Sequence, residues 1–290
     1  MPIVPAPNAG TYSTRTQYVS AKEFLAAPTG VSTSDLVPGG TVAQNQQSLT
    51  MLLERASAWA DNYCQQTIAA SVNTQSGQYR VVWDSALGAV IKVPLANTPV
   101  VAVSDVRIGT TPGGLSELGD YSNIWISRKV ATIPVVSMAH RLFAQVQYVN
   151  GWANTAFTAA ATAGDMVLTV GSALGVMPGQ SLNVQSGSMS ESVTVSPSWS
   201  PSNTAINVAI PITTPLVNAY MVGDTVTAFP QDIKQAVILI TKSLILTKGS
   251  QALIIPQYGA QPSQTQHVQP AVTNDMDIAT GILNSYKRVH

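Results

Sequence analysis

Apolar residues recur at helical spacing from about Asn45 to Gln66. The positions i, i+3, i+7, i+10 and i+14 are taken by Leu49, Leu52, Ala56, Trp59 and Tyr63. This spacing places all of them on one face of an α-helix. Charged and amide side chains occupy the other face. The sequence therefore predicts a long amphipathic helix that buries one side against another part of the chain.

A second helical pattern lies far away in the sequence, over 230–248. Pro230 and Asp232 suit a helix start, because proline fits the first turn and an acid is favourable near the positive end of the helix dipole. Lys248 and Gly249 suit its end. Apolar residues lie nearly all round this segment, so several of its sides are expected to be covered.

The chain between these helices has a different pattern. From Gly77 to Trp152 it consists of short β-branched and aromatic runs bounded by Gly, Pro, Asn or Asp, which predicts a small antiparallel sheet packed on the first helix. Residues 154–228 contain no Lys, Arg or His, and their short strand-like runs alternate with Gly, Pro and Ser turns. This second stretch is typical of a small all-β module inserted into the main fold.

The predicted fold class is therefore α+β. A helical core, with long helices over about 45–66 and 230–248, carries a small antiparallel sheet and an inserted all-β module. The predicted boundaries are an N-terminal arm at 1–17, a core domain at 18–152 and 229–249, a β-domain at 153–228, a Gln/Pro-rich linker at 250–271 and a terminal helix at 272–290.

Charged residues are scarce. The chain has 14 basic and 14 acidic residues out of 290, and its formal net charge is zero. Soluble monomers usually keep a higher charge density, which holds neighbouring molecules apart. The composition therefore favours a chain that buries much of its surface against copies of itself. It disfavours a protein that grips nucleic acid through many phosphate contacts.

Groups suited to catalysis or metal binding are sparse and scattered. No histidine among His140, His267 and His290 lies at metal-ligand spacing from another His or Cys, and the common nucleotide-binding, hydrolase and zinc-protease motifs are absent. Cys64 falls in an apolar helical pattern and is interpreted as a buried small hydrophobe. We expect no enzymatic activity, no cofactor and no metal. The sequence also predicts neither a signal peptide nor a membrane span.

The order of several short segments resembles the head–tail connector (adaptor, or head-completion) proteins of long-tailed bacteriophages. These segments are SLTMLLERASAWADNYCQQ, IKVPLANTPVVAVSDVRI, VQYVNGW, FPQDIKQAV and ILNSYKRV. The resemblance covers about 18–152 and 229–289. It departs from the family pattern at 153–229, where the family runs almost directly from the Gly-Trp end into the helix that begins at Pro230.

The resemblance implies a non-enzymatic structural subunit of the phage neck. In this family a dodecameric ring joins the portal of the capsid to the stopper or tail-terminator protein and extends the DNA channel, through which DNA passes without specific binding. The subunit would bind copies of itself, would have no membrane partner, and would be assembled in the host cytoplasm into the virion. The family's terminal helix docks into the portal, and the matching residues here are Ile282, Leu283, Tyr286, Lys287 and Arg288.

Two other functions are compatible with the residues. One is a different phage tail or baseplate structural protein, which would not bind a portal. The other is a carbohydrate-binding protein whose binding unit is the β-module. An adhesin of that kind would not need the two helical segments, so the sequence favours the connector.

Overall fold

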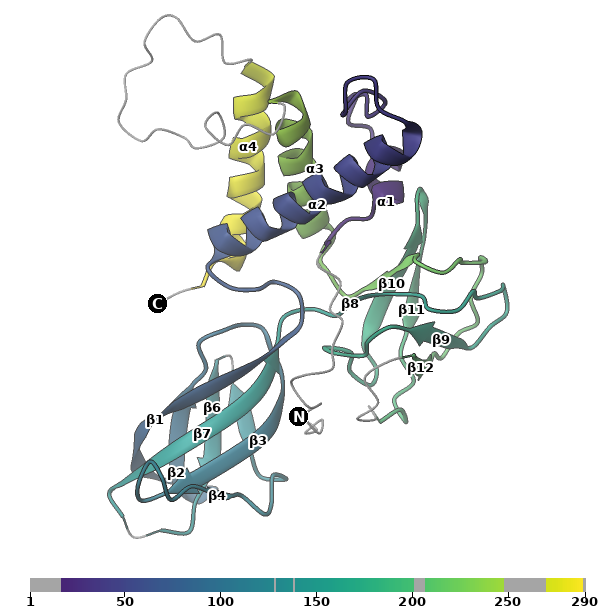
Figure 1. Ribbon diagram of the computed structural model, residues 1–290. Coiled ribbons are helices and arrows are strands. Elements are labelled where there is room, and N and C mark those ends of the chain that lie inside the picture. The colour runs from purple at the N-terminus through teal and green to yellow at the C-terminus, as the bar shows by residue number, and fades with distance from the viewer. Residues whose placement is uncertain (1–16, 128, 138, 201–206, 248–269, 289–290) are drawn as a thin grey trace, which may run out of the picture.

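The computed structural model describes residues 17–127, 129–137, 139–200, 207–247 and 270–288, with only the backbone for 270–274. Nearly all of the predicted arm at 1–17 and of the predicted linker at 250–271 lies outside these ranges. Figure 1 shows a layer of helices, a long twisted sheet and a smaller β-module as three neighbouring parts.

The long sheet has seven strands in the order β4-β3-β7-β1-β2-β6-β5, and each neighbouring pair is antiparallel. Strand β1 has 14 residues and pairs with β7 along 71–80 and with β2 along 81–84. It therefore joins the two halves of the sheet. The strands are β1 (Ser71–Asp84), β2 (Gly88–Pro94), β3 (Val100–Gly109), β4 (Ser116–Glu117), β5 (Trp125–Ser127), β6 (Val130–Pro134) and β7 (Arg141–Asn150).

The β-module follows directly. It has a four-stranded sheet in the order β11-β10-β13-β8 and a two-stranded sheet of β12 and β9. Its first and last strands are direct neighbours, with Asn154 opposite Thr227. The strands are β8 (Asn154–Ala156), β9 (Val167–Val170), β10 (Ser181–Ser186), β11 (Met189–Thr194), β12 (Val208–Pro211) and β13 (Thr225–Thr227).

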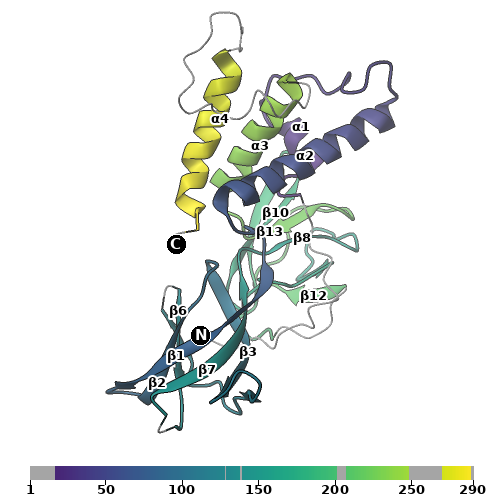
Figure 2. The same ribbon diagram turned by 60° about the vertical axis from the view of Figure 1, so that its left-hand side comes forward.

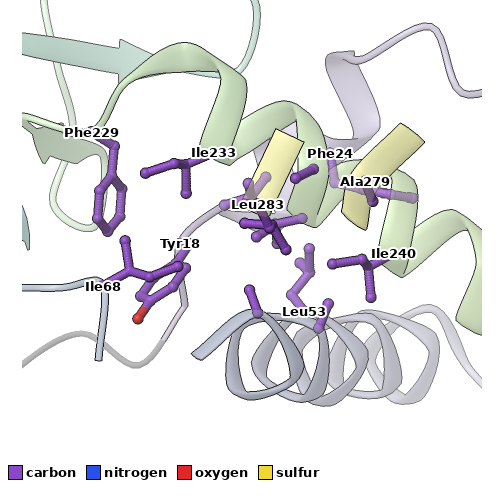
Figure 3. Close-up of a cluster of buried hydrophobic side chains, with 14 of the residues drawn as sticks. Tyr18, Phe24, Leu53, Ile68, Phe229, Ile233, Ile240, Ala279 and Leu283 are labelled. Atoms are coloured by element: carbon purple, nitrogen blue, oxygen red, sulfur yellow. The ribbon is translucent and has the colours of Figure 1, made fainter. Parts of the chain in front are cut away.

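The helical layer consists of α1 (Ala21–Ala26), α2 (Val42–Cys64), α3 (Gln231–Leu246) and α4 (Pro270–Leu283), followed by the 3₁₀ turn η2 (Asn284–Tyr286). Segments from both ends of the chain meet in its core, where Tyr18 and Phe24 lie with Leu53, Ile240 and Leu283 (Figure 3). Ser20 caps α1 and forms a capping box with Glu23.

The predicted fold class is wrong. Helices occupy 42–64 and 231–246, but most of the regular structure is β, and the helices do not form the core of the whole molecule. The helical layer, the β-module and the long sheet each have their own main apolar cluster. The sequence reading underestimated the sheet because it treated each β run as a short strand resting on the helix. A strand of 14 residues that pairs on both sides builds a sheet large enough to bury its own residues.

A buried ion pair within the helical layer also bonds to the β-module. Lys234 on α3 donates to Glu23 Oε1 on α1 at 2.7 Å, and their side chains are only 4% and 2% exposed. The same ammonium donates to Gln185 Oε1 on β10 at 2.8 Å. Nearby, Lys22 on α1 pairs with Asp224 at 2.8 Å. Because buried charges are costly without partners, these contacts hold α1, α3 and the β-module in one arrangement.

Replacing Lys234 by Met leaves the Glu23 carboxylate buried without its cation. We expect this variant to lose about 3–5 kcal/mol of unfolding free energy, whereas Glu23→Leu/Lys234→Met loses much less because no lone charge remains. Urea unfolding measures both. Arg107→Met, at the exposed pair with Asp105, is the matched control and should cost at most about 1 kcal/mol. Equal losses for the single and double variants would contradict this role.

A second buried polar contact fixes the start of the described chain. The Tyr18 hydroxyl donates to Asp61 Oδ1 and accepts from the Ala69 N–H at 3.2 Å, and Asp61 also accepts from the Ile68 N–H at 2.9 Å. Burial raises the pKa of Asp61 above its ordinary value, although both hydrogen bonds act in the opposite direction.

The raised pKa of Asp61 determines the direction in which the unfolding free energy changes with pH. Because the pKa of Asp61 is higher in the folded than in the unfolded chain, the folded state holds its proton more tightly, so protonation favours folding. We expect the unfolding free energy of the wild type, relative to Asp61→Asn, to increase as the pH falls from about 7 to about 4. Denaturant unfolding across this range checks it. A relative loss by the wild type at acid pH would contradict the shift.

Candidate functional site at the C-terminal helix

The C-terminal residues lie against the chain's own helices. Helix α4 runs beside α3, and η2 follows it close to the end of α2 (Figure 2). Met276, Ala279 and Leu283 face the helical core and are buried, while Ile282 is partly buried against the same core. The predicted portal-binding residues therefore differ in access. Leu283 is closed to solvent, and Lys287 is exposed.

Tyr286 is held by contacts on three sides. Its hydroxyl donates to the carboxylate of Asp232 at the start of α3, with oxygen–oxygen distances of 2.8 and 2.7 Å. Its ring meets the Trp152 ring edge-on at 5.5 Å between centroids. Its carbonyl accepts from Gln66 Nε2 at 2.8 Å. Burial and the neighbouring Asp232 raise the pKa of Tyr286, so the hydroxyl stays protonated as a donor at neutral pH.

The last turn of α2 holds the residues that flank Tyr286. The helix ends at Cys64, and the left-handed backbone of the following Gln65 (φ 56°) turns the chain. The Cys64 carbonyl then accepts from the Arg288 N–H at 2.8 Å, and the Tyr63 hydroxyl donates to Asn284 Oδ1 at 2.7 Å. Lys287 Nζ lies 4.9 Å from the centre of the Tyr63 ring, a cation–π contact.

We call this set of contacts the C-terminal clasp, and define it by Tyr63, Gln66, Trp152, Asp232, Tyr286 and Lys287. Gln66 also connects the clasp to the long sheet, because its Oε1 accepts from the Thr98 N–H at 3.0 Å in the loop before β3. The clasp therefore lies where α2, α3, the C-terminal segment and the sheet meet.

The chemistry of the clasp is that of a joint between elements. Burial raises the pKa of the adjacent Cys64 thiol to about 11, so this group is not a thiolate at neutral pH. Within the described ranges, no group of three or more His, Cys, Asp or Glu side chains could hold a metal ion. No helix in the same ranges is long and apolar enough to span a membrane.

Sequence reasoning missed several members of the clasp. Asp232 was interpreted as an acid at a helix start, whereas its carboxylate also accepts from a tyrosine 54 residues away. Gln66 and Trp152 were not assigned a partner. The sequence held one indication of these contacts: Trp152, Asp232 and Tyr286 lie in three of the segments that carry the connector resemblance.

Comparisons with known proteins found little similarity. No protein-family model matches the chain, and no curated protein is similar to it. Among solved structures, a chain in the neck of an empty GTA particle, computed with C6 symmetry, aligns with TM-score 0.35 and 13% identity over 94% of both chains. This TM-score is too low to indicate a shared fold.

Tyr286→Phe removes the hydroxyl that donates to Asp232 and keeps the ring on Trp152. We expect this to loosen 284–288 by about 1.5 kcal/mol, since hydrogen bonds to charged groups contribute about that much. The Arg288 N–H, which bonds to the Cys64 carbonyl, should then exchange with deuterium about tenfold faster. Tyr121→Phe, which removes a hydroxyl bonded to Glu117 on the sheet, is the control. Unchanged exchange in Tyr286→Phe would contradict the role of this bond.

Proposed function

We propose that the chain is a structural, non-enzymatic subunit of a phage neck. In this proposal it forms an adaptor ring that joins the portal vertex of the capsid to the stopper or tail-terminator protein and extends the DNA channel. The subunit assembles in the host cytoplasm and ends in the virion, at the junction of head and tail.

One observation carries the proposal. Residues of four segments that give the sequence its connector-like order meet in the C-terminal clasp: Tyr63 at the end of α2, Trp152 after β7, Asp232 in α3 and Tyr286 in the terminal segment. Nothing in the spacing of these four residues along the sequence predicts that they come together in the fold. Their convergence supports the view that the segment order reflects one structural joint rather than a chance sequence of common motifs.

The charge distribution is compatible with a ring around DNA. The chain has no net charge, and the described cations include several engaged within the chain: Lys22, Arg107, Lys234 and Lys242 in ion pairs, and Lys287 over an aromatic ring. With no excess of positive charge, the chain as a whole does not attract phosphates strongly. Such a surface suits a channel through which DNA must move.

The portal-facing residues in this proposal are Ile282, Leu283, Tyr286, Lys287 and Arg288. In the structure Leu283 is buried and Tyr286 is engaged with Asp232. Contact with a portal through the folded clasp would therefore use Lys287, Arg288 and the exposed part of Ile282. A contact that also uses Leu283 would require α4 to leave α3.

The β-module does not favour the carbohydrate-binding alternative. Sugar platforms use exposed aromatic rings, whereas Trp199 is partly buried against the module's own core.

Cryo-electron microscopy of the chain mixed with the portal protein of the same genome tests the proposal. We expect a ring on the portal with the wild type and its loss in Lys287→Ala/Arg288→Ala, which leaves the apolar core of the helical layer intact. Arg80→Ala/Arg141→Ala, at paired positions in the long sheet, is the matched control and should keep the ring. A variant truncated after Gln269 should also lose it. An intact portal that binds neither wild type nor control would overturn the proposed function.

A further inference from the structure

Three exposed cations lie beside one another on the outer face of the long sheet. Arg80 on β1 stands directly opposite Arg141 on β7. Lys92 on β2 follows Ile91, the residue that pairs with Val81 of β1. Because Val81 and Ile91 face the core of the sheet, the alternation of side chains along a strand places all three cations on the opposite face. We call these three residues the basic row. Figure 1 shows β1 and β7 side by side, running away from the helical layer.

The basic row differs from the other cations of the chain. Several of those are engaged within the subunit, four in ion pairs and one over an aromatic ring: Lys22, Arg107, Lys234, Lys242 and Lys287. Within the described ranges, none of the three side chains of the basic row forms an ion pair or a hydrogen bond. Like charges directly opposite each other on neighbouring strands destabilise a sheet. An anion lying across Arg80 and Arg141 would remove this repulsion.

The carboxylates nearest in the sheet are already engaged. Asp105 on β3 pairs with Arg107 at 2.9 Å. Asp84, at the end of β1, accepts from the backbone N–H groups of Ala86 and Leu87 in the turn that follows. The face that carries the basic row therefore has a net positive charge, although the whole chain has none.

We propose that the basic row binds the phosphate backbone of DNA without regard to base sequence. Three adjacent strands hold the cations about 5 Å apart from strand to strand, and their long side chains can spread from there over neighbouring phosphates. The planar guanidinium of arginine also matches two phosphate oxygens at once. The site is inferred from the sheet alone, whereas its contact with DNA that passes through a ring rests on the proposed function.

A DNA backbone fits this face better than an acidic protein does. Protein interfaces usually have an apolar centre from which charged residues are depleted, whereas protein–DNA interfaces are more polar and much more positive. Beside the basic row, Gln78 is exposed, its partner Phe143 is partly covered, and the next pair is Ser76 and Gln145. The exposed Trp125 lies at the edge of the sheet, on β5, two strands away from β2.

The proposed contact is loose. Three phosphate contacts in each chain give weak binding that falls steeply with salt, because each contact releases condensed counterions. Sequence-independent contacts of this kind let a protein slide along DNA. The basic row would therefore guide the DNA without arresting it, in agreement with the zero net charge of the chain.

Fluorescence anisotropy of a labelled DNA duplex of mixed sequence tests the site, with the full chain titrated between about 20 and 100 mM NaCl. With three contacts, the logarithm of the association constant should fall with the logarithm of salt concentration with a slope of about −3. Arg80→Ala and Arg141→Ala should each reduce this slope by about 1 and weaken binding about tenfold at about 50 mM NaCl. Arg55→Ala, at an exposed position on α2, removes the same charge outside the sheet and should change neither quantity.

Two further measurements sharpen the test. Urea unfolding should show Arg80→Ala and Arg141→Ala to be at least as stable as the wild type, because each removes the repulsion between opposed arginines. Weaker DNA binding is then not a consequence of unfolding. Poly-glutamate of the same charge as the duplex should bind more weakly than the duplex. If it binds as tightly, the partner is an acidic protein and the inference is overturned.

The outcomes separate this inference from the proposed function. No binding of the duplex by the wild type, or equal effects of Arg55→Ala and the two sheet variants, would overturn the inference. A ring on the portal from a chain that does not bind the duplex would leave the adaptor role standing. Duplex binding that depends on Arg80 and Arg141, in a chain that forms no ring on the portal, would support the site and count against the adaptor role.

Discussion

The arrangement of the molecule depends on the buried pair between Glu23 and Lys234. Apolar clusters stabilise the helical layer and the β-module separately, and such clusters tolerate small rotations between the parts they belong to. Hydrogen bonds to charged groups do not tolerate such rotations, because their strength depends on direction and distance. Lys234 reaches α1 and β10 together, and Lys22 of α1 pairs with the buried Asp224 of the module. Turning the module against the helices would therefore break a hydrogen bond to a buried ammonium and separate the Asp224 carboxylate from its cation. A polar contact therefore determines the geometry that the apolar clusters leave open.

The C-terminal clasp has the corresponding role between the helices and the long sheet. Tyr286, Lys287 and the backbone of Arg288 bind the ends of α2 and α3, and Gln66 extends the connection to the loop before β3. Each described part of the chain is thus tied to the helical layer by directional contacts. A subunit built in this way presents its outer surfaces at fixed angles, which an assembly of repeated copies needs.

Features set by neighbouring residues could be predicted from the sequence. The capping box of Ser20 and Glu23, and helices close to 45–66 and 230–248, follow from spacing and local hydrogen bonding. Features that depend on contacts between residues far apart in the sequence could not be predicted. Nothing near Glu23 indicates that its second role is to hold Lys234, 211 residues away. Similarly, the length of β1 depends on its having two partners on opposite sides, which periodicity within the strand does not reveal.

The terminal segment shows the same limit. The resemblance implied a terminal helix that docks into the portal with Leu283 among its contacts, but Leu283 lies on the inner face of α4 with Met276 and Ala279. In the structure that face is covered by the chain's own core. The clasp could not be predicted from the sequence for a related reason, since its members come from segments that only the tertiary fold brings together.

The pairing of β8 with β13 has a consequence for how such chains can diverge. Asn154 and Thr227 stand opposite each other at the two ends of the β-module, and the Ala228 N–H donates to the Ala153 carbonyl at 2.9 Å. The chain therefore leaves and re-enters the rest of the protein at nearly the same point. Between these two strands, loops remote from Gln185 and Asp224 can change in length while Trp152, the start of α3 and the contacts of Lys234 and Lys22 stay in place. The module is thus a site at which evolution can vary a subunit's exterior without remodelling the joint that holds it together.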